Sequence, residues 1–332
     1  MTKLLITGGT GFIGIALVKI LHELGHELKL LVRESSDISP FEKFNNIEYA
    51  YGDVQDIESI RSAVRDVSAI YHLAAYTGIA AKDKAIYQNV NVNGTENVAT
   101  LAIENDIPMF YVSSFTALGP TTEAPVDENY EKEQFCMEYE KSKCHAKKLV
   151  KGLIPKGLKV IMFYPGIVFG PGDFNIFGRM LYDIVRGKML PLGMCPGKGD
   201  SIANFSYVYD LSTAMSSVLG REDLYGEDFI LGGENVRFGS YLDLIADIAR
   251  GKKAKKVPYW LAYVYAFSLE VIAKISRKIP HLTRSTLKAI KYNRSYSSEK
   301  AIKMIDYKIT PLREALEKTI EWYKNYNNKK KG

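Results

Sequence analysis

Residues 7–14 read TGGTGFIG, and this stretch determines the fold class of the 332-residue chain. It follows the apolar run 3–7, which predicts a buried strand, and it precedes residues 12–24, whose apolar positions recur with the period of a helix. Closely spaced glycines between a strand and a helix allow a tight turn and let the backbone approach a pyrophosphate at the helix N-terminus. The stretch therefore predicts a dinucleotide-binding βα unit.

Strands and helices continue to alternate downstream. Strands are predicted over 27–32, 47–51, 69–73, 109–113 and 159–164, and helices over 57–67, 84–104 and 134–151. This spacing is typical of parallel βαβ units, so we expect an α/β fold with a doubly wound parallel sheet of the Rossmann type.

Glycine and proline become dense after about Pro165. We expect residues 1–165 to form the dinucleotide-binding domain and residues 166–326 a smaller α/β substrate-binding cap, from which one strand and helix pair can return to the Rossmann sheet. Further helices are predicted over 241–250 and 312–326, and a disordered basic tail over 327–332.

Composition excludes several classes of protein. The net charge of +6 is spread along the chain without a groove-like basic repeat, so we expect no nucleic-acid partner. The three cysteines indicate no disulfide framework, and their spacing to histidine does not suit a metal site. The N-terminal apolar run is too short for a signal peptide, so we expect a cytoplasmic protein.

Residues 257–269 are uncharged and include Trp260, Tyr263, Tyr265 and Phe267. The segment is too short to span a bilayer, which needs about 20 apolar residues. Because lysine and arginine flank it, it could lie weakly on a membrane surface. The alternative, which we favour, is a cap helix packed over the substrate pocket.

Cofactor preference depends on the end of the second strand. Arg33 follows Gly14 by nineteen residues, where an NAD-selective site usually has an acid. A guanidinium suits the extra 2′-phosphate of NADP. The adjacent Glu34 could reach a ribose, so NAD stays an alternative, and Arg33 could also be a solvated surface charge.

A catalytic pair is predicted on the helix over 134–151. Tyr139 and Lys143 are four residues apart and so share a helix face. A neighbouring ammonium stabilises a phenolate, so we expect Lys143 to lower the pKa of Tyr139 and make it an acid/base group. Ser113 and Ser114 follow the strand over 109–113, on the side of an open α/β sheet where ligands bind.

Several motifs occur in one familiar order. After the glycine turn come GDV at 52–54, HLAA at 72–75, NVNGT at 91–95, the two serines, the Tyr139/Lys143 pair and GPGD at 170–173. In this order the chain resembles an extended short-chain dehydrogenase/reductase of the NAD-dependent epimerase/dehydratase superfamily. The segments FTALG at 115–119, LGGEN at 231–235 and PYWLA at 258–262 resemble the dihydroflavonol 4-reductase-like group, which includes relatives of 3β-hydroxysteroid dehydrogenase.

The resemblance implies roles for matching residues. The catalytic residues would be Ser114, Tyr139 and Lys143. The cofactor-binding residues would be Gly8, Gly11, Phe12, Ile13, Gly14, Arg33, Asp53, Val54, Ala74, Ala75, Asn91, Tyr139, Lys143, Tyr164, Pro165 and Val168. No metal is implied, and related enzymes form homodimers through the helix that bears the tyrosine, so a homodimer is expected.

Two departures from the family pattern bear on the substrate. Tyr164 stands where Arg often precedes Pro165, and Ala203 stands where nucleotide-sugar enzymes often have Arg. The second departure disfavours a nucleotide sugar. The leading hypothesis is an NADP(H)-dependent oxidoreductase that interconverts a ketone and a secondary alcohol on a fairly apolar small molecule. The alternatives are an NAD(P)-dependent sugar epimerase or dehydratase that retains its cofactor, and a cofactor-sensing regulator without turnover.

Overall fold

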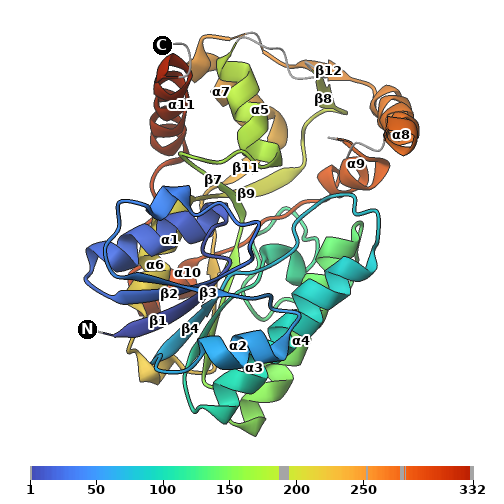
Figure 1. Cartoon of the computed structure of the whole chain (residues 1–332). Coiled ribbons are helices and arrows are strands. Elements are labelled where there is room, and N and C mark those ends of the chain that lie inside the picture. Colours follow the sequence, from blue (N-terminus) through green and yellow to red (C-terminus); the bar gives the residue numbers. More distant parts are fainter. Residues whose placement is uncertain (1, 187–193, 252, 277–279, 281, 330–332) are drawn as a thin grey trace.

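A seven-stranded parallel sheet forms the centre of the molecule (Figure 1). The computed structural model describes residues 2–186, 194–251, 253–276, 280 and 282–329. The strand order is β10-β6-β5-β4-β1-β2-β3, and every neighbouring pair is parallel. The strands are β1 (Lys3–Thr7), β2 (Glu27–Val32), β3 (Ile47–Tyr51), β4 (Ala69–His72), β5 (Met109–Val112), β6 (Val160–Pro165) and β10 (Asp228–Leu231). The expected doubly wound α/β fold is confirmed.

Helices cover both faces of this sheet because its strands alternate apolar side chains between them. In β1, Leu4 and Ile6 face one core, whereas Leu5 faces the other. The first core is closed by α1 (Phe12–Glu23), α6 (Val208–Ser217) and α10 (Glu299–Ile305). The second is closed by α2 (Ile57–Ala63), α3 (Gly94–Glu104) and α4 (Glu138–Leu153).

The remaining C-terminal elements pack at one end of the sheet (Figure 1). A third core joins a small sheet to three helices: β7 (Ile167–Phe169), β9 (Ile202–Tyr207), β11 (Asn235–Arg237), α5 (Ile176–Val185), α7 (Phe238–Ala249) and α11 (Leu312–Lys329). Beyond it lie the paired strands β8 (Met194–Pro196) and β12 (Lys255–Val257), and the helices α8 (Tyr259–Ser276) and α9 (Arg284–Ile290).

Chain segments from the C-terminal half also belong to the large sheet. β10 pairs with β6, and α6 packs against α1. The division into domains at residue 165 stays a prediction. Residues 327–329, expected in a disordered tail, continue α11 instead, and residues 330–332 lie outside the described part of the chain.

Two predicted helices begin later than expected. The helix predicted over 134–151 begins at Glu138, because Met137 is extended and the Cys136 amide donates to the Glu140 carboxylate at 2.7 Å. The segment predicted as one helix over 84–104 is a π-helix, η2 (Tyr87–Asn93), followed by α3. Single π-turns often occur at functional sites.

Candidate active site

The glycine turn between β1 and α1 requires glycine for steric reasons. Gly8 has φ +71°, and a Cβ at this position would lie 2.6 Å from the Ala74 amide nitrogen on the neighbouring β4 loop. A Cβ on Gly14 would lie 2.7 Å from the Gly9 Cα. These close backbone approaches bring the turn, the helix and the loop after β4 together.

The N-terminus of α1 fits a pyrophosphate. Gly11 is the N-cap residue and supplies no side-chain cap, and its own amide donates to the Gly8 carbonyl at 3.0 Å. The amides of Phe12, Ile13 and Gly14 occupy the first turn, where a helix has no internal acceptor for them. They and the positive end of the helix dipole form an anion-binding cradle that a larger residue at Gly11 would crowd.

The predicted adenosine-binding residues follow adjacent strands of the sheet. Arg33 comes directly after β2; it is exposed, and its guanidinium has no hydrogen-bond or ionic partner among the described residues. Asp53 comes after β3 and accepts the Gln55 amide at 2.9 Å, while Val54 is buried against Gly94. Arg33 and Asp53 therefore lie at the same carboxyl edge as the glycine turn.

A buried chain of polar groups supports this edge, and the motifs alone did not reveal it. Thr7 Oγ1 and His72 Nδ1 are 2.7 Å apart, His72 Nε2 and Thr95 Oγ1 are 3.0 Å apart, and Thr95 donates to the Asn91 carbonyl at 2.7 Å. Thr7 Oγ1 also accepts the Ala74 amide at 3.3 Å. Burial lowers the pKa of His72 to about 3, so this histidine is neutral and positions the backbone around Ala74 and Ala75.

Asn91 connects the π-helix to the catalytic helix. Its amide nitrogen donates to Ser142 Oγ at 2.9 Å and to the Tyr76 carbonyl at 3.0 Å, and its Oδ1 accepts the Tyr76 amide at 2.7 Å. The Asn91 side chain thus binds two segments of the protein. Its role as a cofactor-binding residue stays a prediction.

Ser114 and Tyr139 meet beyond the end of β5. Ser114 is the N-cap of the 3₁₀ helix η3 (Phe115–Ala117), and its Oγ accepts the Thr116 hydroxyl at 3.0 Å. Burial raises the pKa of Tyr139 to about 12, and hydrogen bonding with the Ser114 side chain acts in the opposite direction. Tyr139 is therefore protonated near neutral pH and can donate a proton.

Lys143 lies one helical turn further along α4, with only 2 % of its surface exposed. Its Nζ donates to the Val112 carbonyl at 3.1 Å and lies 5.4 Å from the centre of the Tyr111 ring. Burial lowers the pKa of Lys143 to about 7. The expected lowering of the Tyr139 pKa by Lys143 is wrong for this structure, because burial dominates both groups and the lysine bonds to the backbone instead.

A pH-dependent stability should follow from Lys143. Its pKa is about 7 in the folded protein and near 10.5 when unfolded, so the folded state binds fewer protons between these values. The free energy of unfolding should therefore rise with pH in that window, by up to about 1.4 kcal/mol per pH unit. Below pH 7, Lys143→Met should have a higher free energy of unfolding than wild type, because it removes a buried cation. This difference should shrink as the pH rises above 7, and urea unfolding of the cofactor-free protein at several pH values would measure it. Lys141→Met, at an exposed position of the same helix, should not show this, and a constant difference between wild type and Lys143→Met would contradict the prediction.

Helix α4 is fixed to the C-terminal part by a buried ion pair. Glu140, next to Tyr139, pairs with Arg294. Both side chains are at least nine-tenths buried, and the Arg294 amide donates to the Ile202 carbonyl at 2.8 Å. The pair joins the segment that bears Tyr139 to the small sheet.

The residues expected near the nicotinamide lie in β6 and β7, and that role stays a prediction. Tyr164 is fully buried, and its hydroxyl donates to Asp228 at 3.0 Å, so its side chain packs into the interior and only its backbone could face a cofactor. Pro165 ends β6, and Val168 is half-buried in β7. On the neighbouring strand β9, the Asn204 side chain has a structural role, since it binds both the amide and the carbonyl of Gly233 at 3.1 Å.

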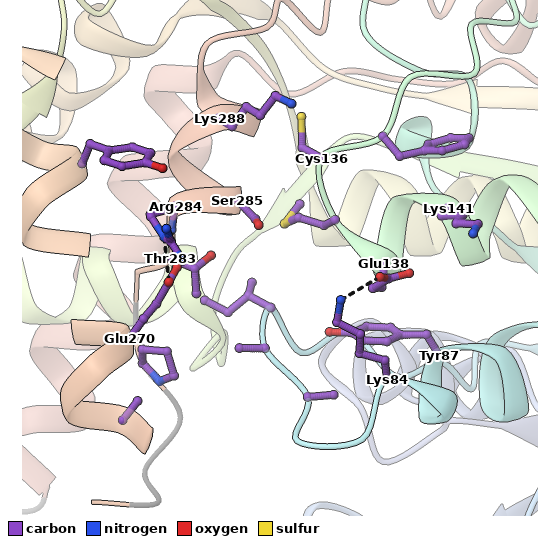
Figure 2. A pocket seen from close by; sticks show the side chains of 18 of the residues that line it. Lys84, Tyr87, Cys136, Glu138, Lys141, Glu270, Thr283, Arg284, Ser285 and Lys288 are labelled. Carbon is purple, nitrogen blue, oxygen red and sulfur yellow. Dashed lines mark hydrogen bonds and ion pairs between the residues drawn. The ribbon is translucent and has the colours of Figure 1, made fainter. Parts of the chain in front are cut away.

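A cavity of about 1540 Å³ lies beside this site (Figure 2). Met137, Glu138 and Lys141, which flank Tyr139, form one wall, and residues of α8 and α9 form the other. Tyr263 of the segment 257–269 lines it, as expected of a cap helix, and so does Tyr292, but Trp260 and Phe267 do not: they are 66 % and 49 % exposed. The expected cap helix therefore packs over the cavity with one face and carries Trp260 and Phe267 on another.

The glycine turn, the anion-binding helix end and the Ser114/Tyr139/Lys143 group define an NAD(P)-dependent oxidoreductase of the extended short-chain dehydrogenase/reductase type. The family model for the NAD dependent epimerase/dehydratase family matches residues 4–232, and the chain belongs to this family.

Two curated relatives match nearly the whole chain. One is sterol demethylase protein B of Methylococcus capsulatus, 25 % identical, with 96 % of this chain and 98 % of the relative covered. The other is a Synechocystis protein provisionally named dihydroflavonol 4-reductase, 27 % identical, with 97 % and 94 % covered.

Solved structures agree in fold. The crystal structure of gox2253 is 32 % identical and superposes with a TM-score of 0.82 over 98 % of this chain and 99 % of the other. UDP-glucose 4-epimerase of Thermus thermophilus, solved with NAD, is 18 % identical, with a TM-score of 0.76 over 97 % and 99 %. The latter similarity concerns the fold alone.

Proposed function

We propose that the protein is an NADP(H)-dependent oxidoreductase that interconverts a ketone and a secondary alcohol on a fairly apolar small molecule. The observation that supports this proposal is that Tyr139, protonated and next to Ser114 at the carboxyl edge of the sheet, is adjacent in sequence to Glu138, which lines the cavity. This placement suits proton donation to a carbonyl oxygen.

Each catalytic side chain has a distinct task. When bound, the dinucleotide supplies or accepts a hydride. Ser114 donates a hydrogen bond to the reacting oxygen, and Tyr139 gives it a proton in reduction or removes one in oxidation. In this proposal Lys143 binds the nicotinamide ribose. Because burial lowers the pKa of Lys143 to about 7, an anionic ligand bound nearby would favour the charged form of this lysine.

The cavity supports a substrate with a sizeable apolar part. Aromatic and apolar side chains line both walls, among them Phe135, Met137, Tyr259 and Tyr263. The position where a nucleotide-sugar enzyme often has Arg holds Ala203, which is 9 % exposed. Lysines also line the cavity, so an apolar ketone that carries an acidic group is the substrate we would test first.

A cofactor-consumption assay tests the proposal. The purified protein would be incubated with NADPH and a panel of aromatic and alicyclic ketones, those that carry an acidic group first, and cofactor loss would be compared with alcohol formed. We expect one NADPH oxidised for each alcohol produced. The proposal would be contradicted if the protein reduced none of the ketones and instead converted a substrate without added cofactor.

The alternative is a sugar epimerase or dehydratase with a retained cofactor. The fold it shares with the NAD-bound UDP-glucose 4-epimerase favours this reading. Such an enzyme needs no added cofactor, so the absorbance of the protein as purified and its activity without NADPH separate the two proposals. Retention of the Tyr139/Lys143 pair argues against a regulator without turnover. A cytoplasmic location and a homodimer stay predictions.

Replacement of Arg33 should reverse the cofactor preference. In Arg33→Ser, loss of charge-assisted hydrogen bonds to a 2′-phosphate should weaken NADPH binding by about 10- to 100-fold. NADH binding should change by less than about 3-fold on the same scale. Titration of protein fluorescence would measure both affinities.

Arg65→Ser is the matched control for this experiment. Arg65 is also exposed, but it lies between α2 and β4, at the amino edge of the sheet. An equal loss of both cofactors in Arg33→Ser, or no loss, would contradict NADP selectivity.

A further inference from the structure

Helix α8 exposes a continuous apolar stripe. Trp260, Val264, Phe267 and Val271 are spaced four, three and four residues apart and therefore share one helix face. Their exposed fractions are 66 %, 55 %, 49 % and 41 %. A monomeric protein rarely leaves so many large apolar side chains together in water.

The stripe is separate from the substrate cavity. The cavity wall on α8 is formed by a neighbouring face of the helix, which carries Tyr259, Tyr263 and Glu270. A third face packs inward through Ala262 and Ala266, both fully buried. The stripe therefore lies beside the cavity and points to a second role for α8, at the outer edge of the molecule (Figure 1).

Exposed cations border the stripe. Lys255 and Lys256 are exposed in β12, five and four residues before Trp260. The acid on α8, Glu270, is neutralised by Arg284 at 2.8 Å. An apolar face with tryptophan and a basic border is the composition that binds an anionic lipid surface.

A second copy of this chain is a less suitable occupant. A symmetric contact through α8 would place the same surface against itself, and Glu270, the acid on α8, is already paired with Arg284 and offers no free carboxylate to the lysines of the other copy. Among the described residues, no helix has both the length and the apolar character to cross a bilayer.

We propose that α8 docks the protein reversibly on an anionic lipid surface through the stripe Trp260, Val264, Phe267 and Val271. Trp260 enters the boundary between headgroups and acyl chains, and the lysines at the border contact lipid phosphates. This docking uses residues outside the proposed reaction site, since none of the four stripe residues lines the cavity.

Vesicle flotation of the full chain tests the proposal. Wild type should float with vesicles of phosphatidylcholine and phosphatidylglycerol at roughly 7:3, bind pure phosphatidylcholine weakly, and detach as salt rises from about 0.1 M to 0.5 M. The double variant Trp260→Ser/Val264→Ser should lower the partition coefficient at least about 10-fold. The control Ile302→Ser/Met304→Ser alters two exposed apolar residues of α10 and should bind like wild type.

Two further measurements keep the test decisive. Trp260 is one of two tryptophans, and the other, Trp322, stacks on Tyr326 in the third core, so a blue shift of emission on vesicle addition would report Trp260. Lys255→Glu/Lys256→Glu leaves α8 intact and should weaken binding to anionic vesicles about 10-fold or more. Circular dichroism would verify that each variant folds.

Three outcomes would overturn the proposal. The first is wild type that does not float with anionic vesicles. The second is a folded Trp260→Ser/Val264→Ser variant that floats as well as wild type. The third is light scattering that shows a dimer in wild type and a monomer in this variant, with no vesicle binding by either, because the stripe would then join two copies of the chain.

Discussion

Tyr139→Phe should lower turnover by about two to four orders of magnitude while cofactor affinity stays unchanged. The substitution removes the tyrosine hydroxyl that lies next to Ser114 and is protonated at neutral pH, and it keeps the ring that packs at the start of α4. Steady-state kinetics in the reductive direction and a thermal shift with NADPH would measure the two effects separately.

The matched control for this variant is Tyr130→Phe. The Tyr130 hydroxyl donates to the Pro120 carbonyl at 2.7 Å, so the control also deletes one tyrosine hydroxyl from the same region. It should cost about 0.5–1.5 kcal/mol of stability and little turnover. Full activity of Tyr139→Phe would refute the assignment of Tyr139 as the proton donor.

Gly14→Ala should weaken cofactor binding by about 100-fold and destabilise the protein by about 1–3 kcal/mol. The added Cβ would lie 2.7 Å from the Gly9 Cα, a backbone atom that cannot move without opening the turn. Alanine is the better helix former by about 1 kcal/mol, so a loss of stability cannot be assigned to helix propensity. Isothermal titration with NADPH and urea unfolding would measure the two effects.

Gly152→Ala should have the opposite effect on stability and serves as the matched control. Gly152 lies in α4, and a Cβ there would meet no atom within 4 Å. This variant should gain about 0.5–1 kcal/mol and bind NADPH normally. If Gly14→Ala behaved like Gly152→Ala, the turn would be looser than the structure shows, and its role in binding pyrophosphate would have to be abandoned.

The large sheet could be predicted from the sequence because the pattern that indicates each strand lies within a few consecutive residues. Buried parallel strands are short apolar runs, and the runs at 3–7, 27–32 and 47–51 form strands with those bounds. The glycine turn was predictable for the same reason, since Gly8 and Gly14 serve contacts within one βα unit and its neighbouring loop.

What was not predictable depends on contacts between distant segments. The late start of α4 follows from the local bond of Cys136 to Glu140, but Glu140 also pairs with Arg294, 154 residues away. The spacing of Tyr139 and Lys143 predicted a shared helix face, yet burial sets their pKa values, and burial depends on the whole fold. The orientation of Trp260 likewise depends on which face of α8 packs inward.

The buried pair of Glu140 and Arg294 also limits how this sequence can change over generations. Loss of one charge would leave the other buried without a partner, at a cost of about 3–5 kcal/mol. That is a large share of the roughly 5–15 kcal/mol that keeps a typical domain folded. Substitutions at the two positions must therefore arise together, or after other mutations have added stability. Changes in the helix that carries Tyr139 are in this way constrained by Arg294, which lies 154 residues further along the chain than Glu140.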